Sequence, residues 1–435
     1  MINLLYIDLF CGAGGTSSGV EYARVDGEKC AKVVACVNHD RNAILSHQAN
    51  HPDALHFTED IRTLELSPMV EHLQRMKTEY PDAYVVLWAS LECTNFSRAK
   101  GGQPRDADSR TLAEHLFRYI ETLQPDYMQI ENVEEFMCWG ELDEHGKPIS
   151  KHKGSDYLRW VRHVCEYGYT YDYHLLNAAD FGAYTSRKRF FGQFARKGLP
   201  IAFPVQTHAK DGDEVSACGC ATATLFPNLY QKWKPVRDVL DLDDNGESIF
   251  ARKKPLCEKT LERIYAGLVK FVAGGKKQHE EFMIRYNSVR PADTVKSLDE
   301  PCGVVTTRNR FGKVKCQFMS KYYGGKDHNE SLDVPSGNQI TTKEGVVGIA
   351  VYDTDSPMTR KVKEFMAMYG IVDICMRMLK ISELKRIMGF PSDYTLIGTQ
   401  AEQKKYIGNA VEVNMSRVLC EALSRRLQKD KKLAV

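Results

Sequence analysis

The chain has 435 residues, 43% of them hydrophobic and 27% charged, which is the balance of a globular protein with a sizeable core. This length suits two domains better than one. No apolar run approaches the roughly 20 residues that a membrane span needs, and Met1–Ile7 is too short and lacks the basic flank of a signal sequence. The 13 cysteines form no framework spacing, so we expect reduced thiols and a cytosolic protein.

The net charge of +2 is unevenly distributed along the chain. From Ser186 to Gly345 there are 27 Lys and Arg against 19 Asp and Glu, a balance of +8 that leaves −6 for the rest. A basic middle between acidic ends favours a segment that faces a polyanion, attached to a different kind of domain. An ordinary solvated surface could have the same composition, so the charge distribution alone does not show that this segment faces a polyanion.

The first two hundred residues alternate apolar runs with helical stretches. Strands are predicted at Ile2–Asp8, Lys32–Val37, Tyr84–Ala89 and Tyr127–Glu131, and the clearest helix at Thr111–Leu123. This alternation predicts an α/β fold with a doubly wound, mainly parallel, Rossmann-like sheet. Ligands bind beyond the carboxyl ends of such strands, so the residues that end each strand are the candidates for chemistry.

The alternation stops after Phe194, and a different organisation is predicted up to about Thr359. Loops dominate this stretch, with one clear helix at Cys257–Val272. A pattern of Phe-Met, Ser-Leu-Asp-x-Pro and Thr-Thr occurs in 282–307 and again in 318–342, at an offset of 34 to 36 residues. Two copies are too few for a solenoid, so we expect a duplicated β-rich unit inside a smaller second domain.

A helical pattern returns from Phe365 onward. Its apolar residues fall four apart on one helical face, which should pack against the first domain. They are Val411, Met415, Leu419, Leu423 and Leu427. We therefore expect a sheet domain at 1–195, a second domain at 196–364 and a returning segment at 365–435.

A Gly-rich turn, Asp8-Leu-Phe-Cys-Gly-Ala-Gly-Gly15, closes the first predicted strand and opens a helix. Glycines there let the backbone approach a ligand closely. The turn departs from the G-x-G-x-x-G pattern of dinucleotide-binding proteins and lacks the Lys of a P-loop. Alone it would mark a tight turn, and its significance depends on the residues that end the neighbouring strands.

Two such residues are Cys93 and Glu131. A lone Cys is usually a small buried hydrophobic residue, but Cys93 lies in a polar, Gly-ended loop where Arg98 and Lys100 favour the thiolate. Glu131 ends an apolar strand, so its pKa should be raised, which suits proton donation. A capping or salt-bridged acid is the alternative for Glu131.

Basic and metal-ligating residues complete the candidates. Arg187 and Arg189 fall on one face of a predicted strand and could hold a base and a phosphate, although such residues are usually solvated. The Cys218-Gly-Cys220 pair near His208 is a poor zinc candidate, because a second Cys pair at finger spacing is missing. We expect no metal.

In order and spacing, these segments resemble the motifs of the DNA cytosine-5 methyltransferase family over nearly the whole chain. The matching segments are Asp8–Gly15, Thr58–Ile61, Ala89–Ser97, Glu131–Val133, Thr185–Arg189, Gly389–Tyr394 and Ile407–Val411. The Ala-Lys-Gly-Gly sequence after the Cys93 loop is similar to a bacterial and phage branch. The resemblance implies a catalytic and cofactor-binding domain at 1–195, a target recognition domain at 196–364 and a C-terminal segment at 365–435 that returns to the catalytic domain.

The resemblance also implies a covalent mechanism. The target cytosine is flipped out of the duplex, Cys93 attacks ring carbon 6, and Glu131 protonates or hydrogen-bonds ring nitrogen 3. Arg189 would hold the base oxygen, and Arg187 the phosphate or the Cys93 loop. Another set of residues would surround S-adenosylmethionine, with Phe10 packed on the adenine. This set is Asp8, Phe10, Gly12, Ala13, Gly14, Gly15, Asn38, His39, Asp60, Ile61, Asn409 and Ala410.

Several residues depart from the family pattern. Leu91 and Glu92 replace two prolines. Asn38 replaces the acid that holds the cofactor ribose, but the amide of Asn38 can still bond a ribose hydroxyl. The other departures are Thr94 and Thr185 in place of Gln, Tyr406 in place of Gln, and Glu412 in place of Pro. A carboxylate beside Cys93 disfavours its thiolate if the two side chains meet. The turnover rate is therefore the property that these departures should affect most.

The resemblance implies S-adenosylmethionine as cofactor and double-stranded DNA as partner. It leaves open whether a cognate restriction endonuclease exists. A monomer without membrane association is expected, in the cytoplasm of a bacterial or phage-infected bacterial cell. Three alternatives remain open. They are an RNA cytosine-5 methyltransferase, a non-catalytic DNA-binding relative suggested by Leu91 and Glu92, and a small-molecule methyltransferase, which would not need the basic second domain.

Overall fold

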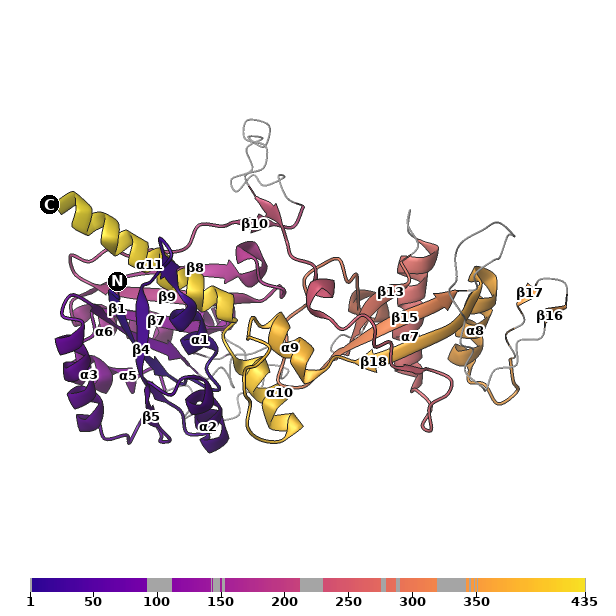
Figure 1. Ribbon diagram of the computed structural model, residues 1–435, viewed down its shortest axis with the longest axis horizontal. Helices are drawn as coiled ribbons and strands as arrows, with labels where there is room; N and C mark the ends of the chain where they lie inside the picture. Colours follow the sequence, from indigo (N-terminus) through magenta and orange to yellow (C-terminus); the bar gives the residue numbers. More distant parts are fainter. Residues whose placement is uncertain are drawn as a thin grey trace, which may run out of the picture. The chain divides into compact units, whose positions relative to one another are not determined.

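The computed structural model describes residues 2–91, 112–141, 143, 149–150, 153–211, 230–274, 279–286, 290–318, 342–343, 346–347, 349 and 351–434. Contacts divide the chain into two units, which can be followed in Figure 1. The first unit comprises Met1–Lys234, Gly303–Arg308 and Leu384–Val435, and the second comprises Pro235–Cys302 and Asn309–Glu383.

The first unit is built on a seven-stranded sheet with the order β5-β4-β1-β6-β7-β9-β8. Its strands are β1 Leu4–Leu9, β4 Ala31–Val37, β5 Leu55–Phe57, β6 Tyr84–Ser90, β7 Tyr127–Asn132, β8 Tyr169–Asn177 and β9 Lys188–Arg196. The first five strands of this order, from β5 to β7, run parallel, and β9 is antiparallel to both of its neighbours. The predicted mainly parallel sheet is confirmed, and the strand order reverses at β1.

Two hydrophobic cores cover the two faces of this sheet. Leu5, Ile7 and Leu9 of β1 enter one core, whereas Leu4 and Tyr6 enter the other, as the two-residue period of a strand requires. Helices from distant parts of the chain cover these faces (Figure 1). The first face is covered by α3 Ser67–Glu79, α5 Leu116–Leu123 and α6 Ser155–Glu166, and the second by α1 Gly15–Tyr22 and α11 Val413–Ala434.

The C-terminal apolar stripe packs as predicted. Val411, Met415, Leu419, Leu423 and Leu427 are all buried in the second core of the first unit. The first unit also contains β2 Arg24–Val25, β3 Glu28–Lys29, α2 Arg41–Asn50, β10 His208–Ala209, β11 Gln231–Lys232 and α10 Gln400–Asn409. The helix α9 Ile381–Ile387 begins in the second unit and ends in the first. No helix within the described ranges is long and apolar enough to cross a membrane.

The second unit contains an antiparallel sheet with the order β12-β18-β15-β13-β14. Its strands are β12 Glu247–Ser248, β13 Glu281–Arg285, β14 Val295–Lys296, β15 Phe311–Phe318 and β18 Ile371–Met378. Helices α7 Glu258–Gly267 and α8 Pro357–Tyr369 pack with this sheet in one core. A two-stranded pair, β16 Thr342–Lys343 and β17 Val346–Val347, follows β15. The predicted smaller, β-rich second domain is confirmed.

Individual predicted elements fall close to observed ones. The four predicted strands correspond to β1, β4, β6 and β7. The helix predicted at Thr111–Leu123 begins at Leu116, after turns, and Thr111 lies outside the described residues. The helix predicted at Cys257–Val272 is α7 continued by a π-helical turn to Ala273. The second copy of the duplicated pattern lies mostly outside the described residues, so the duplication stays a prediction.

The two units divide the chain at positions different from those expected. The expected division at residue 196 falls at Pro235, because the described residues of this segment, 196–211 and 230–234, belong to the first unit: Trp233 Nε1 donates to Asp180 Oδ1 at 2.9 Å. The expected division at residue 365 falls at Leu384, because β18 pairs with β15 and β12 inside the second sheet. Gly303–Arg308, which ends the first copy of the pattern, belongs to the first unit.

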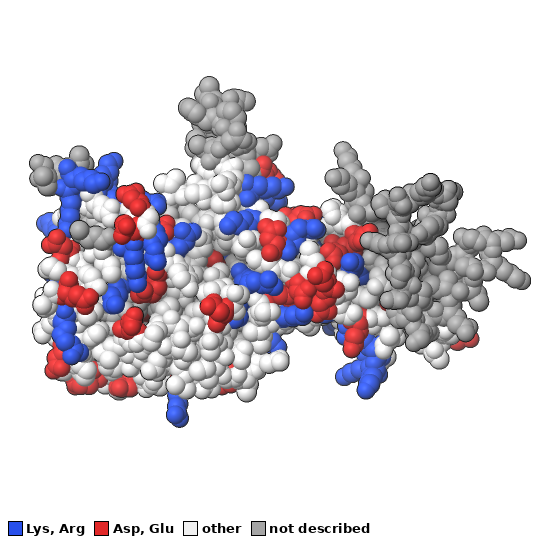
Figure 2. Space-filling model, in the orientation of Figure 1, with Lys and Arg blue, Asp and Glu red and all other residues white. Residues whose placement is uncertain are grey.

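The basic excess of the middle segment is not a property of the second unit. The second unit has 23 Lys and Arg against 21 Asp and Glu, whereas 186–234, which belongs to the first unit, has 8 against 3. On the face shown in Figure 2, acidic and basic side chains are interspersed over the described part of the second unit. The second unit also contains ion pairs, such as Lys380 with Asp241 at 2.8 Å and with Asp244 at 2.7 Å.

Candidate active site

The loop between β1 and α1 has an unusual backbone. Phe10, Gly12 and Gly14 have φ angles of 60°, 54° and 99°, which lie in the left-handed region. Such a conformation costs of the order of 1 kcal/mol or more for a residue with a side chain like Phe10, and this kind of strain is concentrated at functional sites. A Cβ atom added to Gly12 would meet nothing within 4 Å. The loop therefore presents bare backbone beside open space, as a ligand cradle would.

The same loop contacts the last two motifs of the chain. A Cβ atom on Gly14 would lie 2.3 Å from the Tyr394 hydroxyl, and one on Gly15 would lie 2.4 Å from the carbonyl oxygen of Val411. Glycine is required at both positions because any side chain would collide with these groups. Tyr394 also donates a hydrogen bond to the carbonyl oxygen of Ala13. Segments almost 400 residues apart in sequence thus meet at this loop, where Asn409 is exposed.

Asp8, the last but one residue of β1, is buried beneath the loop. Its Oδ2 accepts a hydrogen bond from Ser17 Oγ at 2.7 Å, and its Oδ1 has no hydrogen-bond partner among the described residues. Burial raises the pKa of this carboxyl to about 7, although the bond from Ser17 opposes the rise. The unpartnered oxygen is the kind of group that a bound ligand satisfies.

Asn38 and His39 follow the end of β4 in a polar turn. Asn38 Oδ1 accepts a bond from the Asp40 backbone N–H at 2.9 Å, which leaves the amide NH2 group as a donor. Asp40 caps α2 and accepts a bond from the Tyr406 hydroxyl at 2.9 Å. Tyr406, one of the departures from the family pattern, therefore fastens α10 to the turn that contains Asn38. His39 is exposed and Asn38 is half-buried.

Asp60 and Ile61 lie in a turn after β5. Asp60 pairs with the Arg62 guanidinium at 2.6 Å, and this interaction lowers the pKa of the Asp60 carboxyl to about 2. Ile61 is buried, and its carbonyl oxygen accepts bonds from the Tyr119 hydroxyl at 2.9 Å and from Arg118 at 3.0 Å. Two side chains of α5 thus fix the turn that contains both predicted residues.

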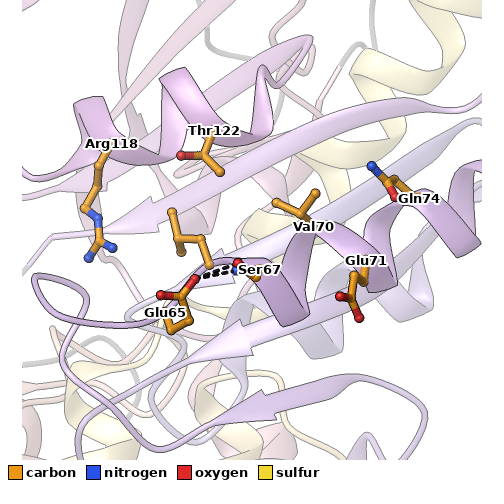
Figure 3. Close-up of a pocket in the computed structure, with 8 residues that line it drawn as sticks. Glu65, Ser67, Val70, Glu71, Gln74, Arg118 and Thr122 are labelled. Carbon is orange, nitrogen blue, oxygen red and sulfur yellow. Dashed lines mark hydrogen bonds between the residues drawn. The ribbon is translucent and has the colours of Figure 1, made fainter.

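A hollow of about 390 Å³ lies between α3 and α5, as Figure 3 shows. It contains none of the predicted site residues, and two of its charged side chains are bonded within the protein. Glu65 Oε1 accepts bonds from the Ser67 hydroxyl at 2.7 Å and from its backbone N–H at 3.0 Å. Arg118 donates to the carbonyl oxygens of Ile61, Arg62 and Leu64. We do not assign this hollow to the active site.

The predicted catalytic carboxyl lies where β6 and β7 end together. Ser90 pairs with Glu131 in the register of these strands. Glu131 is 5% exposed, and its Oε1 lies 3.4 Å from Arg189 Nε. Burial raises the pKa of Glu131, and the charges of Arg189 and Arg187 oppose the rise. Cys93 lies outside the described residues, three positions after Ser90 in the sequence.

Arg187 has different neighbours from Arg189. It is buried, and its guanidinium donates to the carbonyl oxygens of Val305 and Gly408, each at 3.3 Å. Beside it, Thr185 Oγ1 donates to the carbonyl oxygen of Gly303 at 3.1 Å. The β9 end therefore holds Gly303–Arg308 and the end of α10 in place. The duplicated pattern ends at Thr306-Thr307 in this segment, but the pattern does not indicate which residues the segment contacts.

Glu412, where the family has Pro, should make stability depend on pH. It is fully buried and caps α11, and its Oε2 accepts a bond from the Met415 N–H at 2.9 Å. Burial raises its pKa from the usual 4.5 to about 7, despite the opposing bonds from the Asn414 and Met415 backbone. The neutral form of Glu412 therefore contributes to the free energy of unfolding. This contribution is fully present below about pH 4.5 and is lost as the pH rises through about 7.

We expect Glu412→Gln to be more stable than the wild type at about pH 8, by up to about 3 kcal/mol, and similar to it at about pH 5. The reason is that the amide stays neutral where the carboxyl ionises. Urea unfolding at both pH values measures the difference. Glu166→Gln, a change of an exposed acid on α6, is the matched control and should alter neither value. A Glu412→Gln protein that is less stable at both pH values would contradict this account.

Comparison with known proteins decides the family. The model for C-5 cytosine-specific DNA methylases matches residues 4–425. The chain belongs to this family. Within this methylase family, the chain is 23% identical over 456 residues to the Type II methyltransferase M.AgeI of Thalassovita gelatinovora, covering 96% of this chain and 98% of that protein.

Two further comparisons agree with this family. The Type II methyltransferase M.XorII of Xanthomonas oryzae is 29% identical over 231 residues, so the match spans about half of each protein, 52% of this chain and 48% of that one. A solved structure of DNMT2 from Spodoptera frugiperda, 15% identical, shares the fold with a TM-score of 0.53 and covers 97% of this chain and 99% of that chain. The methylase family match therefore extends across both units described above.

Proposed function

We propose that this chain transfers a methyl group from S-adenosylmethionine to carbon 5 of a flipped cytosine in duplex DNA. The observation that carries the proposal is the pair formed by buried Glu131 and half-buried Arg189 at the end of β7, beside the strand end that leads to Cys93. A buried acid with a raised pKa next to a guanidinium suits a heterocycle that must accept a proton and present an oxygen.

The residues around the β1–α1 loop fit S-adenosylmethionine. Gly12 faces open space, Asp8 has an oxygen without a partner among the described residues, and the Asn38 amide can bond a ribose hydroxyl. When bound, the cofactor supplies the methyl group. We propose that the following residues surround it: Asp8, Phe10, Gly12, Ala13, Gly14, Gly15, Asn38, His39, Asp60, Ile61, Asn409 and Ala410.

Four side chains would carry the reaction on cytosine. The Cys93 thiolate adds to carbon 6, while Glu131 gives a proton or a hydrogen bond to nitrogen 3, so that electron density reaches carbon 5. After methylation, loss of the carbon-5 proton and departure of Cys93 restore the aromatic ring. Arg189 holds the base oxygen. Arg187 acts as a positioning residue, because its guanidinium bonds to the backbone of Val305 and Gly408.

The departures before Cys93 have different meanings. Leu91 is 4% exposed and packs in the first core of the sheet. Its apolar side chain therefore contributes to this core, and a Pro ring would pack there differently. Glu92 and Thr94 lie outside the described residues. We propose that these replacements change the rate and leave the reaction type unaltered.

We also propose that the first unit binds the cofactor and performs the reaction, and that the second unit selects the DNA sequence. The motif residues named above all belong to the first unit, and the second unit has a core of its own. The basic excess in 186–234 would contact phosphates, which position a protein on DNA without reading its sequence. A cognate restriction endonuclease would recognise the same DNA site. One copy of this chain, acting as a monomer in the cytoplasm of a bacterial cell, would be sufficient to perform the reaction.

The test is transfer of labelled methyl groups by the full-length chain to duplex DNA and, in parallel, to tRNA. We expect label in DNA as 5-methylcytosine, identified by mass spectrometry, and none in tRNA. Sequencing of methylated positions should reveal one short site, and replacing Pro235–Cys302 and Asn309–Glu383 by those of a relative should change that site. Label in tRNA alone would favour the RNA methyltransferase, and duplex binding without transfer would favour a non-catalytic relative.

A further inference from the structure

Three side chains that have no role in the proposed reaction meet beneath the β1–α1 loop. They are Cys11 of that loop, Cys36 of β4 and His47 of α2. All three are buried, and their potential ligand atoms all lie within 4.8 Å of one another. Cys36 Sγ lies 3.5 Å from His47 Nδ1. The tetrahedral zinc sites of proteins, with Zn–S bonds of about 2.3 Å and Zn–N bonds of about 2.0 Å, separate a sulfur from a nitrogen by about 3.5 Å.

The orientation of His47 suits a metal ligand. Its Nε2 lies 2.9 Å from Ser17 Oγ, and the Ser17 hydroxyl donates to Asp8 Oδ2 at 2.7 Å. When the Asp8 carboxyl is ionised, the Ser17 hydrogen is used for Asp8 and Ser17 accepts from His47, so the proton lies on Nε2. The Nδ1 lone pair then faces Cys36. In metal sites, the second ring nitrogen of a histidine ligand usually donates a hydrogen bond to a neighbouring polar group, which fixes the orientation of the ring. The bonds from His47 to Ser17 and from Ser17 to Asp8 are of this kind.

A fourth donor lies beside Cys36 and His47, outside the group of three whose ligand atoms are all within 4.8 Å of one another. His56 of β5 has its Nε2 3.0 Å from His47 Nδ1, and Cys36 has hydrogen bonds with both Cys11 and His56. Two neutral imidazoles can share one hydrogen at this distance, and an ion between the rings would replace that hydrogen bond. Such a replacement needs a separation of about 3.3 Å, only a few tenths of an ångström more than the observed one.

We propose that Cys11, Cys36, His47 and His56 form a structural zinc site. Two thiols and two imidazoles are the ligand set of closed zinc sites, and they are poor ligands for magnesium or calcium. The ion would join the β1–α1 loop, β4, α2 and β5, and so would fix the loop that contains Gly12. This inference does not depend on the proposed reaction, because it concerns binding of an ion by the free protein.

The direct measurement is cobalt(II) titration of the full-length chain, purified under reducing conditions and freed of metal by a chelator. We expect one cobalt per chain, with the intense visible absorption of a tetrahedral thiolate site, and its loss when zinc is added. Total zinc in protein purified without chelator should likewise approach one per chain. Removing the zinc should lower the thermal midpoint, and adding it back should restore that midpoint.

Variants locate the site. Cys36→Ala and His47→Ala should each lose the cobalt absorption, whereas Cys302→Ala, which changes a buried free thiol in the second unit, should keep it. A Cys218→Ala/Cys220→Ala protein should also keep it. A wild-type chain that takes up no cobalt and contains no zinc would overturn the proposal, and this result needs no variant to fold. Absorption that survives Cys36→Ala but is lost in the Cys218 and Cys220 variant would overturn it as well.

Discussion

Cys93→Ser is expected to abolish methyl transfer while leaving duplex DNA binding measurable. A serine hydroxyl is a far weaker nucleophile than a thiolate near neutral pH, so the addition to carbon 6 that starts the reaction should fail. Replacing a nucleophile of this kind lowers kcat by roughly 10³-fold or more. Single-turnover transfer of labelled methyl groups measures the loss, and Cys257→Ser, a change of an exposed thiol in the second unit, is the control.

A duplex with 5-fluorocytosine at the target position tests the same residue in a second way. Fluorine cannot leave carbon 5 as a proton does, so elimination of Cys93 stalls and the covalent complex persists. We expect a denaturant-resistant complex for the wild type and for Cys257→Ser, and none for Cys93→Ser. A Cys93→Ser protein that methylates at the wild-type rate would exclude the covalent mechanism.

Glu131→Gln is expected to lower kcat by roughly 10²- to 10⁴-fold, the usual contribution of a general acid. Gln occupies the same volume beside Arg189 but cannot give up a proton to ring nitrogen 3. Glu134→Gln is the matched control: Glu134 lies three residues farther on, is partly exposed, and pairs with Lys188 at 3.4 Å. Its replacement should leave kcat within a few-fold of the wild type.

The pH profile separates an acid from a residue that only shapes the site. Burial raises the Glu131 pKa, so more of the protonated form survives toward neutral pH than for an exposed carboxyl. Activity that needs this form should decline as the pH rises through that pKa, and the Glu131→Gln profile should lack this decline. Equal proportional losses at every pH would instead show that Glu131 acts by packing alone.

Much of the fold and of the candidate site could be predicted from local sequence. The strands β1, β4, β6 and β7 are continuous apolar runs, because strands of a covered parallel sheet are buried on both faces. Their ends are marked by polar residues, so Asp8 and Glu131 could be assigned to the ligand edge. The prediction of a raised pKa for Glu131 is confirmed for the same reason: a carboxyl at the end of an apolar strand loses its hydration.

Other features depend on contacts between residues far apart in the chain, which leave no periodic pattern. The division between the units at Pro235 and Leu384 follows from how β18 and Trp233 pack, and loop composition does not reveal it. Arg187 donates to two carbonyl oxygens more than a hundred residues away, which no local pattern indicates, and its expected place at a phosphate or at the Cys93 loop stays a prediction.

The cluster of thiols and imidazoles is the clearest case of a feature that only the tertiary structure decided. Cys11, Cys36, His47 and His56 come from a loop, a strand, a helix and another strand, so their spacing matches no metal-binding pattern. The sequence instead drew attention to Cys218 and Cys220, which are close neighbours in the chain. Sequence determines which side chains end each strand because that depends on local burial, whereas the convergence of ligands depends on how strands and helices pack together.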